Sequence, residues 1–506
     1  MSRENSIVFD IEMLIMGRKN YLVVVLLFLV PCIAIAGNRF TLNNVVNSFS
    51  SADSLPAAAH FDSTVNDHKL IVGDIYITGN KKTRAYIIER ELPFKKGDSL
   101  SLQDLTQRFV TSRQQLINTQ LFHEVAVYIK QFRGYVTDIQ IEVKERWYII
   151  PLPYVKPVDR NFSAWADQGY KLSRLNYGVK FYYDNFTGRN DKLKLMFITG
   201  YTHQYSISYD QPYADNTLKH GFGASASYAG VKEMNVSTVN NKQFFLNVDS
   251  VSNANKYINE LFNVTLSYYF RPAIYTRHIF RLGFTVNKID NSVLEHNPKY
   301  FPNGSTKMAY PEFAYSWRYQ NIDYIAYPRI GRAAEINFLK RGFSQDMNLW
   351  QLAAKYTQAW PLGWKLFYVG QVNGTIKLPF DQPYYNQRLI GYGDFSFRGL
   401  EKYVVDGVAG VAAFNTIKRE IINTNFNNFL PLSTSRIPLQ VFVKTYTDIG
   451  YSYSKPPVYN SLQNSFLYTY GVGVDVVTFY DLVFRFECSF NQLGEHGFFF
   501  HLRNDF

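Results

Sequence analysis

The chain has 506 residues, of which 17% are aromatic and only 19% are charged, and its formal net charge is +12. Soluble domains usually carry about 25% charged residues, and beyond the N-terminus no run of about 18 apolar residues is present to form a membrane-spanning helix. The basic residues are scattered rather than clustered, so we expect no nucleic-acid partner. Many aromatic residues without a spanning helix indicate a transmembrane β-barrel, in which lipid-facing and lumen-facing residues alternate. A soluble, aromatic-rich β-sandwich is the alternative.

An apolar stretch near the N-terminus has the form of a targeting signal. Two basic residues at 18–19 precede an apolar run over residues 21–35, and Ala36 completes an A-x-A sequence. This combination predicts a secretory signal peptide over residues 1–36. A lipoprotein signal at Cys32 and an uncleaved anchor are the alternatives.

Residues 37–67 are rich in Asn, Ser, Ala and Asp and show no hydrophobic period, so we expect a flexible linker. The sequence leaves open whether translation starts at Met1 or Met16. The chain has two cysteines, Cys32 and Cys488. Two cysteines make no disulfide framework, so the compartment must be inferred from the targeting signal.

A small α+β domain is predicted over residues 68–148. It begins with an alternating strand that ends in a Gly79-Asn80 turn. Thr83 is expected to cap a first helix and Ser101 a second. Two further strands follow, the last with apolar residues at every second position from 139 to 143. The order β-α-α-β-β with one polar face predicts a sheet covered by helices on one side.

Segments with a period of two recur over residues 149–506, with turn residues between them. For example, Val264, Leu266 and Tyr268 alternate with polar residues. We count about 16 candidate strands, an even number as outer-membrane barrels require, the first of them near residues 174–184. The predicted fold is therefore an antiparallel transmembrane β-barrel of about 16 strands, preceded by the small α+β domain.

The last segment is amphipathic, from Gly497 to the end of the chain. One face carries Phe498, Phe500, Leu502 and Phe506. A barrel must close, because an unpaired edge in lipid leaves backbone groups unsatisfied.

One long stretch, at about residues 380–407, does not fit the strand pattern. It is polar and rich in glycine, and its centre reads Phe397-Arg398-Gly399-Leu400. We expect this loop to fold back into the lumen of the barrel.

Residues 68–148 resemble a POTRA domain. The matching motifs are Ile77-Thr78-Gly79-Asn80, Lys96-Gly97-Asp98, Thr119-Gln120-Leu121-Phe122 and Val143-Lys144-Glu145. The resemblance implies that the domain binds unfolded polypeptide by strand addition to an open sheet edge. A rigid spacer is the alternative.

Four motifs in the rest of the chain resemble the BamA/TamA superfamily of outer-membrane assembly and secretion barrels. In chain order they are Asn185-Phe186-Thr187-Gly188-Arg189, Gln211-Pro212-Tyr213, Phe397-Arg398-Gly399-Leu400 and Tyr446-Thr447-Asp448-Ile449-Gly450. The terminal aromatic strand resembles the signal by which barrel assembly machines recognise their clients.

The resemblance implies that Arg398 of the loop meets Asp448 on the barrel wall, while Gly399 permits a tight turn. The alternation of polar and apolar residues over 439–449 agrees with this pairing, because it places Asp448 on the polar face of the predicted strand. A solvated pair lining a wide pore is the alternative. A second acidic partner is common in the family. Glu420 is the nearest carboxylate on the preceding strand, and its register looks wrong.

We therefore expect an outer-membrane insertion or translocation factor of a Gram-negative bacterium, with the POTRA-like domain in the periplasm. Its partners would be unfolded outer-membrane or secreted polypeptides, outer-membrane lipid, and accessory periplasmic or lipoprotein subunits. A client strand would add at a seam between the first barrel strand, near residues 174–184, and the last, residues 497–506. The alternatives are a dedicated secretion pore for one exoprotein and a passive channel.

No enzymatic chemistry is expected. The sequence offers no ordered Ser/His/Asp set, and neither metal-ligand spacing nor a phosphate-binding loop. We expect no catalytic residue, no metal and no cofactor.

Overall fold

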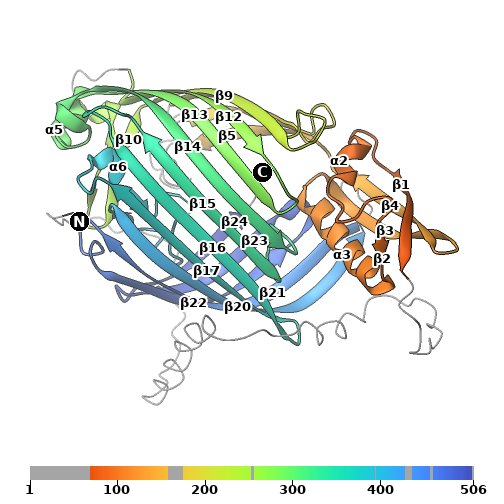
Figure 1. Ribbon diagram of the computed structural model, residues 1–506. Helices are drawn as coiled ribbons and strands as arrows, with labels where there is room; N and C mark the ends of the chain where they lie inside the picture. The colour runs from red at the N-terminus through yellow and green to blue at the C-terminus, as the bar shows by residue number, and fades with distance from the viewer. Residues whose placement is uncertain are drawn as a thin grey trace, which may run out of the picture. The chain divides into compact units, whose positions relative to one another are not determined.

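The computed structural model describes residues 69–157, 175–251, 256–393, 395–427, 436–455 and 460–503 (Figure 1). The expected signal peptide and linker, residues 1–67, and the terminal Phe506 lie outside these ranges. Within them, no helix has the length and apolar character needed to cross a membrane.

The N-terminal part of the described chain is a four-stranded sheet with two helices. The strands are β1 (Leu70–Thr78), β2 (Ser99–Leu100), β3 (Phe122–Arg133) and β4 (Val136–Glu145), in the order β2-β1-β4-β3. The helices are α2 (Ala85–Glu89) and α3 (Leu102–Asn118).

The core of this domain lies between the helices and the sheet. Ile87 and Ile88 of α2 and Leu116 of α3 are buried against Ile139 and Ile141 of β4. Burying each such side chain contributes about 1.5–3 kcal/mol. The alternation of apolar residues in β4 therefore determines which face of the sheet the helices cover.

The two predicted helix caps have different outcomes. The Ser101 hydroxyl accepts a hydrogen bond from the Asp104 N–H at 3.0 Å and caps α3. The prediction for Thr83 is wrong, because the N-cap of α2 is Arg84 and makes no side-chain cap. Thr83 instead lies 3.0 Å from the Tyr148 hydroxyl and accepts a hydrogen bond from the Asn185 amide.

The rest of the chain forms a 16-stranded antiparallel sheet. Consecutive strands pair throughout, apart from two insertions, the hairpin β10–β11 and the pair β18–β19. The strands are β5 (Ile149–Pro157), β6 (Leu175–Asp184), β7 (Lys192–Gly200), β8 (His203–Gln211), β9 (His220–Val231), β12 (Asn259–Phe270), β13 (Thr276–Ile289), β14 (Lys307–Ile322), β15 (Gly331–Arg341), β16 (Leu349–Gly363), β17 (Leu366–Leu378), β20 (Ala409–Asn427), β21 (Arg436–Tyr453), β22 (Phe466–Val477), β23 (Val483–Asn491) and β24 (His496–Arg503).

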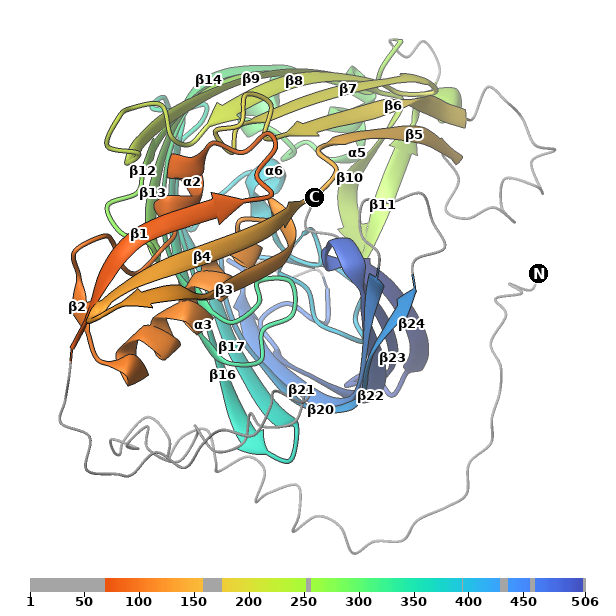
Figure 2. The same ribbon diagram turned by 90° about the vertical axis from the view of Figure 1, so that its right-hand side faces the viewer.

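The first strand of this sheet is β5, not the segment near residues 174–184. That segment corresponds to β6, the second strand. The sequence prediction failed here because β5 reads IIPLPYVKP, and proline argues against a strand in the interior of a sheet. Proline is tolerated on an edge strand, and β5 pairs only with β6. Figure 2 shows β5 and β24 as the two end strands of the curved sheet.

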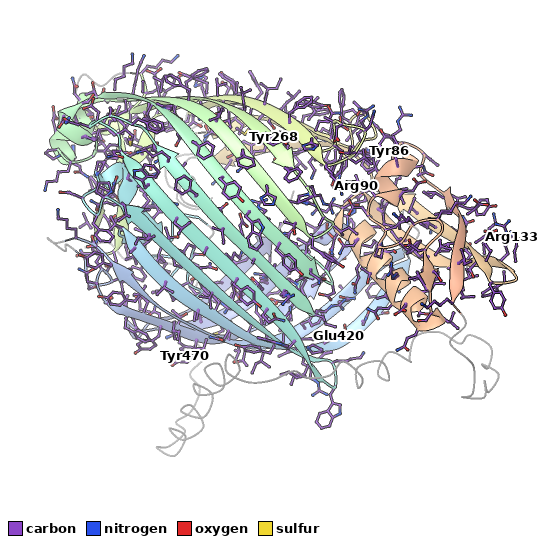
Figure 3. All side chains as sticks on the ribbon, viewed as in Figure 1. Tyr86, Arg90, Arg133, Tyr268, Glu420 and Tyr470 are labelled. Atoms are coloured by element: carbon purple, nitrogen blue, oxygen red, sulfur yellow. The ribbon has the colours of Figure 1, made fainter. Side chains whose placement is uncertain are left out.

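The outer face of the sheet is apolar and aromatic. In β12, Val264, Leu266 and Tyr268 are exposed, and Tyr470 of β22 is exposed in the same way; Figure 3 shows Tyr268 and Tyr470 among the side chains on the barrel surface. The alternate positions of the strands carry polar residues that point inward. This alternation is the pattern expected of a transmembrane barrel.

The two insertions pack inside one end of the barrel. The hairpin comprises β10 (Glu233–Val239) and β11 (Lys242–Asn247), and the long loop contains α6 (Tyr384–Gln387), β18 (Arg388–Ile390) and β19 (Val405–Asp406). Three short helices complete the turns: α5 (Asn291–His296) and the 3-10 helices η4 (Val248–Ser250) and η5 (Pro302–Gly304). A fourth short helix, η6 (Phe479–Asp481), lies between β22 and β23.

Candidate functional site

The loop between β17 and β20 is packed through its central motif. Phe397 and Leu400 are buried in a cluster with Ala412 of β20 and Leu467 of β22. The ring of Phe397 also lies 5.5 Å from that of Phe414, centroid to centroid. The motif is therefore a packed element of the interior.

Arg398 and Asp448 form the polar centre of this packing. The Arg398 Nε donates to Asp448 Oδ2 at 2.8 Å, its Nη2 donates to Oδ1, and its backbone N–H reaches Oδ2 at 3.3 Å. The Asp448 side chain is fully buried and that of Arg398 is 20% exposed. A bidentate, charge-assisted pair of this kind fixes both the position and the orientation of the guanidinium.

Two further contacts of Arg398 were not predicted from the sequence. Its Nη1 donates to the Thr416 hydroxyl at 2.9 Å, and its guanidinium lies 4.0 Å from the centroid of the Tyr446 ring. A cation over an aromatic face is attracted by the ring quadrupole. The two extra partners come from β20 and β21, so Arg398 ties the loop to two adjacent wall strands.

Glu420 lies elsewhere. Its carboxylate is 3.2 Å from the Lys365 amine and 3.8 Å from the Arg329 guanidinium. The strand register places Phe414 opposite Asp448 and Glu420 opposite Phe442. Thr416 therefore occupies the position on β20 that faces Arg398.

Two glycines permit this close approach. Gly399 has φ of +88°, and a Cβ there would lie 2.8 Å from the Ser489 side chain. Gly450 has no room for a side chain because a Cβ would lie 2.7 Å from the Phe397 ring. Any other residue at these positions would push the loop from the wall.

The interior next to this pair holds a second buried ion cluster. The Lys444 amine lies 2.6 Å from both Asp475 and Glu487, and all three side chains are at most 3% exposed. The Tyr446 ring lies between the two clusters, with its centroid 4.0 Å from the Arg398 guanidinium and 5.8 Å from the Lys444 amine. The sequence alone does not predict this cluster, because the pairing depends on the register of three strands.

The turn at Gly79 and Asn80 supports the end of the small domain. Gly79 has φ of +87°, and a Cβ there would lie 1.9 Å from the Val143 carbonyl oxygen. The Asn80 amide donates to the Thr83 carbonyl at 3.0 Å. This turn therefore holds the start of α2 close to β4.

The small domain contacts the barrel through buried ion pairs. Glu91 accepts hydrogen bonds from the two Nη atoms of Arg271 at 2.5 and 2.7 Å, and both side chains are at most 4% exposed. Burial alone would raise the pKa of Glu91, but the adjacent Arg271 outweighs it, and the pKa is lowered.

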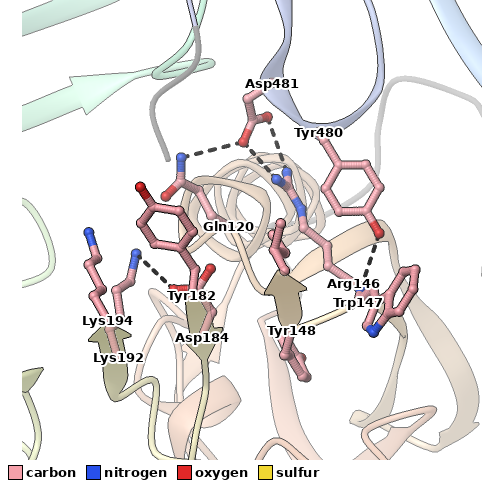
Figure 4. A pocket seen from close by; sticks show the side chains of 11 residues that line it. Gln120, Arg146, Trp147, Tyr148, Tyr182, Asp184, Lys192, Lys194, Tyr480 and Asp481 are labelled. Atoms are coloured by element: carbon pink, nitrogen blue, oxygen red, sulfur yellow. Dashed lines mark hydrogen bonds and ion pairs between the residues drawn. The ribbon is translucent and has the colours of Figure 1, made fainter. Parts of the chain in front are cut away.

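A second junction lies around Asp481 of η6. Figure 4 shows Arg146 and Gln120 of the small domain directed at this carboxylate in a small pocket. Arg146 binds it through two hydrogen bonds of 2.7 and 3.1 Å, and Tyr324 donates to it at 2.5 Å. The domain is thus tied to both halves of the barrel rim.

The last strand presents its aromatic residues outward. Phe498 is 71% exposed, Phe500 54% and Leu502 53%. The rings of Phe498 and Phe500 form an outer cluster with those of Phe484 and Phe486 of β23. These side chains lie on the face that meets lipid in a transmembrane barrel.

Among the described residues, one group has the side-chain types of a metal site: Glu401, Glu487 and His501. Glu487 is already paired with Lys444, and the His501 Nε2 lies 3.4 Å from each of the two glutamates. These contacts join the three residues in one polar cluster that links the loop to β23 and β24.

Comparison with known proteins identifies the family. A model of the Omp85 superfamily domain matches residues 185–478, more than half of the chain. A POTRA model, described as a surface antigen variable number repeat, matches residues 70–146. No curated protein matches the sequence.

Solved structures similar to the chain include BamA from Haemophilus ducreyi lacking POTRA domains 1-3, at 16% identity and a TM-score of 0.46, covering 86% of this chain and 83% of that one. CdiB from Escherichia coli matches at 11% identity and a TM-score of 0.48, covering 87% and 75%. CdiB from Acinetobacter baumannii matches at 16% identity and a TM-score of 0.44, covering 86% and 74%.

The superfamily model follows a matched POTRA domain, as the sequence motifs predicted, and the resemblance is confirmed. The chain belongs to the Omp85 superfamily of outer-membrane assembly and translocation proteins, with its barrel in the outer membrane of a Gram-negative bacterium and its POTRA domain in the periplasm.

Proposed function

We propose that this protein inserts other outer-membrane polypeptides by strand addition at a seam in its barrel, without enzymatic chemistry. The observation that carries the proposal is the pattern of strand pairing. Each strand from β5 to β24 pairs with its neighbour in the sheet, whereas no ladder joins β24 to β5 in the part of the chain that the structure describes. An unpaired strand edge in lipid costs several kcal/mol per unsatisfied group, so this edge is suited to receive a client strand.

The POTRA domain offers a first contact for the client. Its strand β3 lies at the edge of the sheet and pairs only with β4. Tyr128 and Phe132 of β3 are 42% and 58% exposed. An exposed edge with adjacent apolar side chains favours the binding of an extended peptide by β-augmentation.

The Arg398 pair has a supporting role in this proposal. It ties the loop to β20 and β21, while His501 and Asn491 connect the loop to the last two strands. The wall next to the seam would keep its shape while a client occupies the edge. Client folding and burial of the client's apolar face in lipid would supply the driving force.

The contents of the barrel favour lateral release over threading. Hairpin β10–β11 and the long loop are linked by the Val404 N–H, which donates to the Asn241 carbonyl at 2.8 Å. Asn241 also binds Asn460 and Leu462 in the turn before β22. A secretion pore for one exoprotein would have to break these contacts to pass a chain through the lumen.

Depletion of the protein followed by outer-membrane proteomics tests the proposal. We expect many barrel proteins to fall together. Loss of a single secreted protein would instead support the dedicated pore, and an unchanged outer membrane would contradict both.

Locking the seam separates the mechanisms further. A bis-maleimide between Val155→Cys in β5 and Phe500→Cys in β24 should stop insertion. A bond between Phe484→Cys and Leu502→Cys is the matched control, because these residues are already paired across β23 and β24. Continued insertion with the seam locked would contradict lateral release.

A further inference from the structure

The two strands that border the seam differ in the hydrogen bonds that their free edges can make. In an antiparallel ladder, alternate residues direct both backbone groups toward the partner strand, and the residues between them direct both groups away. The register and one hydrogen bond at the end of each ladder therefore determine which residues face the seam.

On β5, the odd-numbered residues face the seam. The Asp184 N–H donates to the Tyr148 carbonyl at 2.9 Å, and the register from Ile149 opposite Tyr183 to Pro157 opposite Leu175 has no shift. The even-numbered residues of β5 therefore bond to β6. The free edge consists of residues 149, 151, 153, 155 and 157.

Three of these five positions are proline, namely Pro151, Pro153 and Pro157. Proline has no backbone N–H, so only Ile149 and Val155 can donate from this edge. All three prolines are odd-numbered, whereas the even-numbered residues bond to β6. The missing proline N–H groups therefore take no hydrogen bond away from the β5–β6 ladder. The edge is thus a poor template for another strand.

On β24, the even-numbered residues face the seam. The Asn491 N–H donates to the Glu495 carbonyl at 3.0 Å, and the register from His496 opposite Phe490 to Arg503 opposite Val483 has no shift. The odd-numbered residues of β24 therefore bond to β23. The free edge carries four donors, from His496, Phe498, Phe500 and Leu502, and contains no proline.

We infer that β24, and not β5, is the edge that receives the client strand. The inference rests on the proposed function and specifies which side of the seam does the templating. Self-closure of β24 onto β5 would use at most two β5 donors, so it competes weakly with a client that has a full set of backbone groups. The prolines remove three of the five β5 donors and so weaken closure of the seam onto itself.

The side chains of β24 indicate the kind of strand that fits. Phe498, Phe500 and Leu502 point outward, and His501 points inward to Glu401 and Glu487. Cross-strand pairs on one face stabilise a sheet most when both are aromatic or branched. The matching occupant is an extended client segment with apolar residues at every second position and polar residues between them.

Photo-crosslinking of the full chain in lipid nanodiscs tests this inference. The probe is a synthetic peptide with the sequence of residues 497–506, which carries apolar residues at positions 498, 500, 502 and 506 and polar residues at 501, 503 and 505. A photoreactive residue replaces Leu502 in β24 or, as the matched position on the other edge, Val155 in β5. Both side chains are exposed, at 53% and 68%. We expect adducts at position 502 and few at 155.

Two double variants separate backbone from side-chain effects. Phe498→Pro with Phe500→Pro removes two edge donors but no donor to β23, and should lower the adduct yield at 502 by about tenfold. Phe498→Ala with Phe500→Ala removes the same rings but keeps the donors, and should lower it less. Heat-modifiable migration on gels checks that each barrel is folded.

Adducts mainly at 155, or equal yields at both positions, would overturn the choice of edge while leaving strand addition at the seam intact. Equal effects of the proline and alanine pairs would overturn the backbone argument. Absence of adducts at both positions would overturn the inference, and depletion proteomics would then decide separately whether the protein is an insertase.

Discussion

Arg398 shows how one residue can hold a loop inside a barrel. Its partner Asp448 is fully buried and receives three donors from Arg398 alone. Removing one member of a buried ion pair leaves the other charge without a partner, which typically costs about 3–5 kcal/mol. We therefore expect Arg398→Ala to release the loop. Limited proteolysis should then cleave within residues 397–403, which we expect to be protected in the unaltered protein because Phe397 and Leu400 are buried.

Two variants control for this result. Arg398→Lys keeps the charge but cannot form the bidentate pair, so its protection should be intermediate. Asp381→Asn removes an exposed ion pair with Lys455 near the same loop and should change protection little, because solvent-exposed pairs contribute little. Full protection in Arg398→Ala would contradict a structural role for the pair.

His123 makes one POTRA–barrel contact sensitive to pH. Its ring packs edge-on against Tyr480 of η6, with centroids 4.7 Å apart. Burial, and then the nearby Arg146, lower the pKa of His123 to about 4. An unfolded histidine has a pKa near 6.5. The folded pKa is the lower of the two, so the neutral ring stabilises the contact above about pH 6.5, and this is lost as the pH falls toward about 4.

We expect acidification to loosen this junction. Spin labels at Lys95→Cys in the POTRA domain and Trp364→Cys in the β16–β17 turn should give a broader distance distribution at pH 5 than at pH 7. His123→Phe keeps the ring contact and cannot titrate, so its distribution should not change with pH. Equal broadening in both proteins would assign the effect to another group.

At the scale of the element, the Glu91–Arg271 pair joins the segment directly after α2 to the turn after β12. Glu91→Gln removes the charge but keeps the shape, leaving Arg271 with a weakened partner in a buried site. We expect a loss of about 3 kcal/mol in docking of the domain, from the cost of breaking a buried pair. Hydrogen exchange should then accelerate in residues 85–92 and 271–275.

The matched control lies in the same domain. Asp74→Asn breaks the exposed pair with Lys96, whose side chains are 43% and 70% exposed. It should leave exchange in residues 85–92 unchanged. If hydrogen exchange in residues 85–92 of Glu91→Gln is as slow as in the unaltered protein, apolar packing alone docks the domain.

The elements that the sequence predicted are those with a strong period or a local signal. The amphipathic strands, the Ser101 cap and the POTRA motifs are of this kind. Strand β5 was missed because its prolines oppose strand formation in general and are compatible only with an edge, which is a property of the whole sheet. Thr83 was predicted as a helix cap from its local sequence alone. Its actual contacts, with Tyr148 and Asn185, come from segments far along the chain that local sequence does not reveal.

The same limit applies to the site. The sequence paired Arg398 with Asp448 only through a family resemblance. Thr416 was missed because a hydroxyl has no charge signature, and Tyr446 and Ser489 depend on registers that the sequence does not determine. Long-range register, rather than composition, is what the structure adds.

At the scale of the whole molecule, opposite ends of the barrel are occupied by different parts of the chain. The POTRA domain contacts the rim near the start of β9, where Leu218 packs against the domain core. Hairpin β10–β11 begins just after the other end of β9 and packs onto the long loop (Figure 1). The two insertions therefore occupy the end of the barrel away from the POTRA domain, and no ladder joins β5 to β24 among the described residues, an arrangement that agrees with the proposed sideways release.

Asn241 is the residue on which closure of that end depends. It is 6% exposed, its Oδ1 accepts from the Leu462 N–H at 3.0 Å, and its Nδ2 donates to Ser461 at 2.8 Å. Asn241→Ala leaves a buried N–H unpaired, at a cost of about 1–3 kcal/mol. We expect larger or more frequent conductance steps in planar bilayers.

Asn303→Ala is the matched control. Asn303 also has a positive φ, 55° compared with 60° for Asn241, but its side chain binds Asp346, which is exposed. Conductance equal to that of the control would show that the hairpin does not close the lumen, and threading would regain support over lateral release.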